Sequence, residues 1–317
     1  MILHCGKCGA EAPEELGFCI NCKTRFIPRN AYDLQLSDFA YGPDQSAIES
    51  LKVTGPLPYI IKNLTVTDLE KRMLSKLSQE AHRVTYPSAL DSIIRKCATT
   101  LALDSIPDVF VVDGGAPNAF TFGSEEKACL VVYSSLLESA NENELTAVLG
   151  HELGHIKSGH MLYHTLAEVL GRGASLSASL FGLNIISIPI QLALLSWHRE
   201  SEVTADRASL LVVKDVNVVT ALLRKLALSP NPVGEQNIAD EPGMLESASE
   251  LFRTHPILSK RIKLVREFAN SNEFLRAEEK IELERTVLHG LLPFCRFCGT
   301  KKTSEALFCP TCRRAQV

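Results

Sequence analysis

His151-Glu152-Leu153-Gly154-His155 is the most informative stretch of this sequence. In an α-helix, residues four positions apart lie on one face, so the imidazoles of His151 and His155 can both reach a single ion. Glu152 follows the first histidine, where its carboxylate can act as a general base on water held by that ion. The motif alone is a hypothesis, and two surface histidines on a helix are the alternative, so the flanking residues must decide.

The residues before the motif indicate a helix. Asn141 is followed three positions later by Glu144, which is the form of a capping box with asparagine in place of serine or threonine. Leu145, Val148 and Leu149 then show the apolar spacing of a helix that continues into the motif. We therefore expect both histidines on one helix.

A third ligand is needed, and the two nearest histidines are poor candidates. If the helix continued, His160 and His164 would lie about 140° and 180° around it from His155 and would face elsewhere. The metzincin pattern requires glycine at position 158 and histidine at position 161, but the chain has Ser158 and Met161. The third ligand should therefore come from another element.

A second helix offers a glutamate. Glu202 can bind zinc, while Asp206, one turn further on the same face, can hold a ligand imidazole by its other ring nitrogen. Glu200 is the competing ligand, but the residue one turn after it is Thr204, not a carboxylate. A solvated acidic helix face is the alternative, and it does not explain the apolar run that follows at residues 210–213.

The cysteines form two matched sets at the ends of the chain. Each set has two Cys-x-x-Cys pairs whose inner cysteines are separated by ten residues; the sets are Cys5, Cys8, Cys19 and Cys22, and Cys295, Cys298, Cys309 and Cys312. Glycine follows the second cysteine and phenylalanine precedes the third in both sets. Each set predicts a closed, tetrahedral structural zinc site, because redox dithiols do not usually occur as matched quartets. Only Cys97 and Cys129 lie outside the sets.

Composition excludes several classes of protein. The chain has 317 residues, of which 45% are hydrophobic and 22% charged, so it is globular rather than disordered. Its net charge of −4 gives no support to a nucleic-acid binder, although the C-terminal cysteine set is basic and leaves anionic lipid or nucleic acid open there. Residues 1–5 lack a secretory signal, so we expect a protein on the cytoplasmic side that is not secreted.

The rest of the chain predicts helices around a small sheet. Helices are expected at four places, residues 44–51, 67–82, 88–103 and 197–213, and a meander-like sheet from strands 108–112, 118–122 and 129–133. A proline-rich loop should interrupt the helical C-terminal part at residues 229–243.

An uncharged stretch, residues 174–197, is long enough to span a membrane but contains many polar side chains. A single span would place His155 and Glu202 on opposite sides of a bilayer. A second span would have to include Glu168 and Arg172, which are costly there. A hairpin over about residues 166–197 that packs on the domain or dips into one leaflet is favoured over two full spans.

Four motifs in order resemble the HtpX and CAAX-prenyl-protease family of zinc metallopeptidases. They are His-Glu-Leu-Gly-His; Arg199, Glu202 and Ala205-Asp206; Thr254-His255-Pro256; and the upstream Asn118-Ala119-Phe120. The resemblance covers roughly residues 40–270. It implies an α+β, mainly helical gluzincin domain with a small sheet.

The resemblance also implies roles for single residues. His151, His155 and Glu202 would bind the catalytic zinc, Glu152 would be the base, and His255 would stabilise the oxyanion. Asn118, Ala119 and Phe120 would lie on an edge strand that holds the substrate backbone. From the residues alone, Asn118 is equally a turn residue and His255 a helix cap.

These observations predict a zinc ribbon at residues 1–27, a linker with a short helix at 28–66, a metallopeptidase domain at 67–292 and a second ribbon at 293–317. The predicted function is a zinc endopeptidase that binds three Zn²⁺ ions, one catalytic and two structural, and acts on peptide or protein substrates. A non-catalytic zinc-ribbon adaptor is the alternative. Expected partners are proteins recruited by the ribbons and a membrane surface, rather than nucleic acid.

Overall fold

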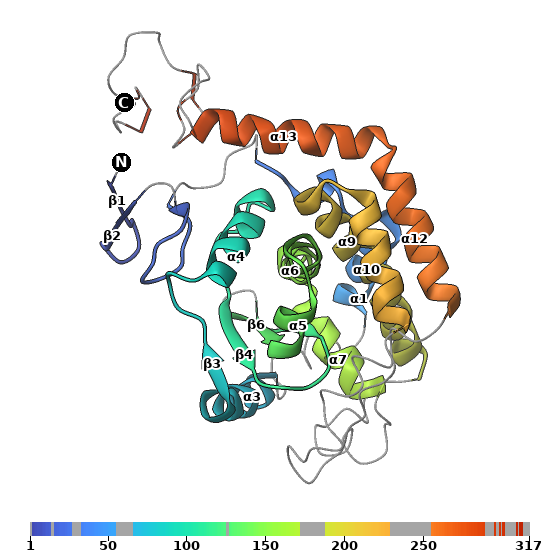
Figure 1. The fold of residues 1–317 in the computed structure, drawn as a ribbon. Helices are drawn as coiled ribbons and strands as arrows, with labels where there is room; N and C mark the ends of the chain where they lie inside the picture. Colours follow the sequence, from blue (N-terminus) through green and yellow to red (C-terminus); the bar gives the residue numbers. More distant parts are fainter. Residues whose placement is uncertain are drawn as a thin grey trace.

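The computed structural model (Figure 1) describes most of the middle of the chain and parts of its ends. The described residues are 2–13, 16–26, 33–54, 66–124, 127–171, 188–228 and 255–288, together with 295, 298, 300, 301, 309, 311 and 312. The expected loop at 229–243 and residues 172–187 of the apolar stretch lie outside them.

Helix α6 (Glu142–Lys157) runs through the centre of the molecule and carries the His-Glu-Leu-Gly-His motif. It begins with the expected capping box: the amide of Glu144 donates to Asn141, and the amide of Asn141 donates to Glu144. Nearly all of the helix after its first turn is buried. Its neighbours are α9 (Ile188–Val213), α4 (Ala89–Thr100) and α10 (Val216–Leu228), which share the main apolar core with it.

The sheet covers another side of α6 and has the order β3-β4-β6-β5. Its strands are β3 (Ala81–Arg83), β4 (Asp108–Val112), β6 (Ala128–Tyr133) and β5 (Ala119–Gly123). The expected meander is wrong, because β6 lies between β4 and β5, parallel to the first and antiparallel to the second. The buried run Cys-Leu-Val-Val of β6 explains this order, since a strand buried on both faces suits the middle of a sheet.

The remaining helices surround this core. They are η2 (Leu36–Asp38), α1 (Gly42–Val53), α3 (Val66–Glu80), α5 (Ser134–Ser139), α7 (Met161–Gly171), α12 (His255–Ala269) and α13 (Asn272–Leu288). The four helices expected from the sequence are found as α1, α3, α4 and α9. Helix α3 ends at Glu80, because the next residues form β3 rather than continuing the helix to residue 82, and α9 begins at Ile188, nine residues before the expected start.

Trp197 is the centre of a second, smaller core. Its fully buried side chain packs with Tyr163 and Leu166 of α7 and with Ile48 and Leu51 of α1. The end of the apolar stretch that the structure describes therefore belongs to α9 and packs on the domain. None of the helices among the described residues combines the length and the apolar character needed to cross a membrane.

The N-terminal cysteine set is joined to the main domain. Cys5 and Cys8 lie in the connection of a small hairpin of β1 (Ile2–His4) and β2 (Glu11–Pro13), and Cys19 and Cys22 follow it. Phe18 belongs to the main core cluster, and its carbonyl accepts a hydrogen bond from Arg95 at 3.1 Å. Lys23 contacts Asp108 at 2.6 Å, and the amide of Arg25 donates to the carbonyl of Asp104. This set is therefore anchored beside β4.

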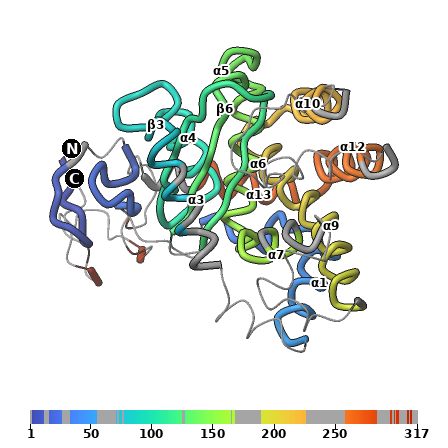
Figure 2. Tube along the Cα trace, turned by 90° about the horizontal axis from the view of Figure 1, so that it is seen from below, coloured from blue at the N-terminus to red at the C-terminus, as the bar shows by residue number. Residues whose placement is uncertain are grey.

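The two cysteine sets lie on the same side of the molecule, away from α9 and α12 (Figures 1 and 2). The buried side chains Cys5, Cys19, Phe26, Cys295 and Cys309 form one contact cluster. The two ends of the chain therefore meet at their cysteines.

Candidate active site

Two glycines bring α6 and α9 unusually close together. A Cβ added at Gly154 would lie 2.6 Å from the Cβ of Ala208, and one added at Gly150 would lie 3.2 Å from the Cα of Ser209. Neither glycine position has room for a larger side chain without a shift of α9. This close packing places one face of α6 directly against the carboxylates of α9.

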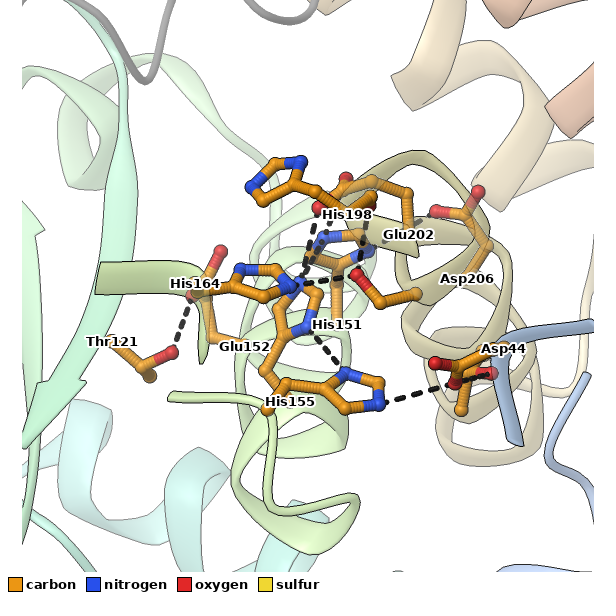
Figure 3. Close-up of polar contacts among 12 residues, drawn as sticks. Asp44, Thr121, His151, Glu152, His155, His164, His198, Glu202 and Asp206 are labelled. Atoms are coloured by element: carbon orange, nitrogen blue, oxygen red, sulfur yellow. Dashed lines mark hydrogen bonds and ion pairs between the residues drawn. The ribbon is translucent and has the colours of Figure 1, made fainter. Parts of the chain in front are cut away.

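His151, His155 and Glu202 meet between the two helices (Figure 3). The Nε2 atoms of the two imidazoles are 3.2 Å apart, and each lies 3.4 Å from a carboxylate oxygen of Glu202. A tetrahedral zinc with bonds of about 2.0–2.1 Å has neighbouring ligand atoms about 3.3–3.4 Å apart. The Oε2 atom of Glu202 is buried, and among the described residues it makes ion-pair contacts with His151 and Arg261 but no hydrogen bond. Both the spacing and the donor types fit zinc.

The electrostatics favour a cation at this point. Burial raises the pKa of Glu202, but Arg261 and the two imidazoles outweigh burial and hold this pKa well below its ordinary value. Burial lowers the pKa of His151, but contacts with Asp206 and Glu202 reverse the effect and raise it to about 10. The pKa of His155 falls to about 4, mainly through burial. A charged carboxylate therefore faces two nitrogen ligands.

Asp206 and Arg261 contact the side chains of this three-residue cluster. The carboxylate of Asp206 lies 3.1 Å from Nδ1 of His151, as expected for a residue that orients a ligand imidazole. Arg261 of α12 donates two hydrogen bonds of 2.7 Å to Asp206, and its guanidinium also lies 3.1 Å from Glu202. Sequence reasoning missed Arg261, because nothing local distinguishes it from the other basic residues of α12.

Glu152 faces the edge of the sheet. Its carboxylate is 8% exposed and accepts a hydrogen bond from the hydroxyl of Thr121 at 3.2 Å. Thr121 lies on β5, the last strand of the sheet within the described part of the chain. The glutamate therefore lies between the three-ligand cluster and a strand edge.

The expected orientation of His160 and His164 is wrong, because α6 does not continue past Lys157. The backbone reverses at Gly159, whose φ is +67°, and α7 starts two residues later. The Nδ1 atom of His160 then lies 3.1 Å from Nδ1 of His155, and the ring centroid of His164 is 4.4 Å from that of His155. Both histidines belong to the surroundings of the site.

Two further buried side chains near the site also escaped sequence reasoning. His198 of α9 lies beside His164, with ring centroids 4.2 Å apart, and burial lowers the pKa of both imidazoles. Asp44 of α1 lies 3.1 Å from His160. Burial raises the pKa of Asp44, but contacts led by that with His160 outweigh burial and lower it. His198 and Asp44 could not be predicted as site residues from the sequence near them, because only the packing of separate helices brings them to the site.

The residues expected to bind substrate are described only in part. Asn118 precedes β5, and its side-chain oxygen accepts a hydrogen bond from the amide of Ala119 at 2.9 Å. Phe120 is half-buried on the strand. His255 is the first residue of α12, and its side chain lies outside the described part of the chain.

The two cysteine quartets have similar geometry. The Sγ–Sγ distances are 3.4 Å for Cys5–Cys22 and 3.6 Å for Cys8–Cys19, and 3.6 Å for Cys295–Cys312 and 3.4 Å for Cys298–Cys309. A tetrahedral zinc with Zn–S bonds of about 2.3 Å separates its sulfurs by about 3.8 Å. Burial raises the pKa of Cys22 and Cys298, but hydrogen bonds led by those with Thr24 and Thr300 lower it to about 6 in both. Both sets can hold a metal ion.

Comparison with known proteins finds a metallopeptidase and proteases among the relatives of this chain. The chain is 40% identical over 141 residues to the plastoglobule-localized metallopeptidase 48 of Arabidopsis thaliana, and the similar region covers 44% of this chain and 40% of that protein. It is 29% identical to HtpX protease homologues of Streptococcus uberis and Streptococcus equi, over about half of this chain and 67% and 66% of theirs. The chain thus spans less than half of the length of the plant relative.

The model of peptidase family M48 matches residues 87–269. The matched segment contains α6, α9 and the four strand-edge residues from Asn118 to Thr121. Because this segment is more than half of the 317 residues, the chain belongs to peptidase family M48.

Proposed function

We propose that this protein is a zinc-dependent endopeptidase. The observation that carries the proposal is the cluster of two imidazole nitrogens and one carboxylate at zinc spacing, with Glu152 beside it. The membership in family M48 supports the same conclusion. His151, His155 and Glu202 would hold the ion and leave one coordination position open.

The residues of the site would have separate roles in peptide hydrolysis. A zinc ion bound here would polarise the scissile carbonyl and lower the pKa of a water molecule. Glu152 would act as the general base and then as the proton donor to the leaving amine, since its carboxylate is next to the cluster without belonging to it. Arg261 and Asp206 keep the ligands in place.

An extended peptide would bind along the outer edge of β5, which pairs with no other strand among the described residues. The amide of Tyr133 donates to the carbonyl of Asn118, which makes these two residues a hydrogen-bonded pair of the antiparallel ladder. Backbone groups alternate along a strand, so those of Phe120 point toward β6, and those of Ala119 and Thr121 point toward the edge. We therefore assign main-chain pairing to Ala119 and Thr121, and side-chain contacts to Asn118 and Phe120.

His255 is the proposed oxyanion-stabilising residue, as the family resemblance implies. The domain division at residues 1–27, 28–66, 67–292 and 293–317, and the two structural zinc ions at the chain ends, are part of the same proposal. The ribbons would recruit protein partners or substrates. The protein would act on the cytoplasmic side, in contact with a membrane surface through the apolar stretch that ends in α9.

A non-catalytic adaptor is the second candidate function. In a non-catalytic protein the catalytic side chains could be replaced without loss of function. In this chain His151, Glu152, His155 and Glu202 are all present and lie close together. This convergence favours the enzyme.

The test is Glu152→Gln with Glu142→Gln as its matched control. Glu142 is an exposed glutamate on the same helix. Glu152→Gln should retain zinc at the site and lose peptide hydrolysis, because the substitution removes proton transfer but no ligand. Glu142→Gln should keep wild-type turnover. Hydrolysis by Glu152→Gln at the wild-type rate would refute the assigned role, and absence of hydrolysis by wild type loaded with zinc would favour the adaptor.

A further inference from the structure

A chain of buried side chains leads from His155 away from the proposed zinc (Figure 3). The Nδ1 atom of His155 lies 3.1 Å from Nδ1 of His160, and Nε2 of His160 lies 3.1 Å from Oδ2 of Asp44. His160 and Asp44 are completely buried. The three residues come from α6, from the turn before α7 and from α1, so folding alone brings them together.

The contacts determine where the protons lie. When Nε2 of His155 gives its lone pair to a metal, the neutral ring carries its proton on Nδ1. That N–H donates to Nδ1 of His160, so a neutral His160 carries its own proton on Nε2. This second N–H lies at ion-pair distance from the carboxylate of Asp44. Each nitrogen of the two rings then has one defined role.

The carboxylate of Asp44 is itself held by α9. Its Oδ1 accepts from the indole Nε1 of Trp197 at 2.8 Å, and its Oδ2 accepts from the hydroxyl of Thr204 at 2.5 Å. Thr204 in turn accepts from the amide of Tyr41, just before α1. Trp197 and Thr204 flank the ligand Glu202 on the same helix. Asp44 is therefore fixed relative to a metal ligand on one side and to His160 on the other.

We propose that Asp44 and His160 are positioning residues, which hold the ring of His155 in the orientation and tautomer that zinc binding requires. This inference rests on the proposed catalytic zinc. Asp44 lies before residues 87–269, the segment that the family model matches. Helix α1 would therefore be a working part of the active site in this protein, although it lies outside the matched domain.

A metal role for His160 is the competing explanation, because His155, His160 and His164 also bring ligand atoms within 4.8 Å of one another. A ligand role would use the Nδ1 or Nε2 lone pair of His160 for an ion. The positioning role instead uses Nδ1 as an acceptor and places Nε2 3.1 Å from the carboxylate of Asp44, at ion-pair distance but outside hydrogen-bond geometry. The two roles predict different zinc counts when His160 is replaced.

The first experiment compares Asp44→Asn with Glu49→Gln by titrating the protein with zinc against a chromophoric chelator. Glu49 is an exposed carboxylate on the same helix, so its substitution removes the same charge. Asp44→Asn should weaken zinc binding at the catalytic site about 10–100-fold, in the range for lost ligand-orienting partners. Glu49→Gln should leave it unchanged. Equal affinity in the two variants would overturn the proposal.

The second experiment separates positioning from packing. His160→Asn retains an amide oxygen where Nδ1 was and should recover much of the zinc affinity, whereas His160→Leu fills the space without an acceptor and should lose it. Equal losses in the two variants would overturn the positioning role. Loss of one whole zinc from an otherwise intact catalytic site would establish a metal role instead. A wild-type protein that binds no zinc at His151 and Glu202 would refute the proposed function and not this inference alone.

Discussion

Gly154 of α6 lies against Ala208 of α9 so closely that a Cβ at Gly154 would be 2.6 Å from the Cβ of Ala208. No pair of real Cβ atoms approaches to that distance, so the contact requires glycine. The contact lies between the His-Glu-Leu-Gly-His motif and the helix of Glu202. The fourth residue of the motif therefore sets the distance between the ligands of the two helices.

Gly154→Ala should separate the ligands. The added methyl group must push α9 away, which should cost about 1–3 kcal/mol of folding free energy as overpacking. A ligand displacement near 1 Å should lower peptide hydrolysis about 100-fold. The double variant with Ala208→Gly should recover activity, because it removes the opposing Cβ. Gly42→Ala, where a Cβ meets nothing within 4 Å, is the control. Full activity of Gly154→Ala would contradict the packing argument.

Elemental analysis of the full-length protein should find three zinc ions per chain. One belongs to the site at His151, and one to each closed cysteine quartet. Cys19→Ser and His151→Gln should each remove one ion. A single zinc per chain in the wild-type protein would refute the structural sites.

Zinc uptake by the catalytic site should release about one proton per ion. In the zinc-free protein, contacts with Asp206 and Glu202 raise the pKa of His151 to about 10, so this imidazole is protonated at pH 7.5. A metal binds only the neutral ring, and the proton must leave. Calorimetry in buffers of different ionisation enthalpy measures the release, using protein whose cysteine sites are already loaded. Binding enthalpy that does not change with the buffer would show that His151 is neutral beforehand.

Phe18→Ala should destabilise the whole domain. The side chain is 1% exposed and belongs to the same core cluster as α6, so the loss should be about 3–5 kcal/mol. Ile20, from the same cysteine module, is 42% exposed, and Ile20→Ala should change stability by less than about 0.5 kcal/mol. Thermal unfolding checks both. Equal melting temperatures would mean that the N-terminal module folds independently.

Membrane fractionation tests the apolar stretch. If the stretch packs on the domain or dips into one leaflet, part of the protein should sediment with membranes and be released by alkaline carbonate. Two full spans would require detergent for release. Release by detergent alone would therefore overturn the hairpin proposal.

Much of the site could be anticipated from local spacing. His151 and His155 share a helix face because they are four residues apart, and Glu202 and Asp206 share a face of α9 for the same reason. The two cysteine quartets could be predicted from the spacing of their cysteines alone. The two histidines, the two carboxylates of α9 and the members of each Cys-x-x-Cys pair lie within four residues of each other, so a linear pattern was enough to find them.

The order of the sheet and the surroundings of the ligands were decided by tertiary structure. The position of β6 between β4 and β5 follows from burial on both of its faces, which strand propensity does not reveal. If α6 continued past Lys157, His160 would face away from the site. The chain instead reverses at Gly159, which places His160 beside His155. Asp44 and Arg261 reach the site from α1 and α12, each more than fifty residues from the residue it contacts. Which residues become such partners depends on how the helices pack and on which buried charges need an opposite charge. The spacing of residues along one helix indicates neither of these.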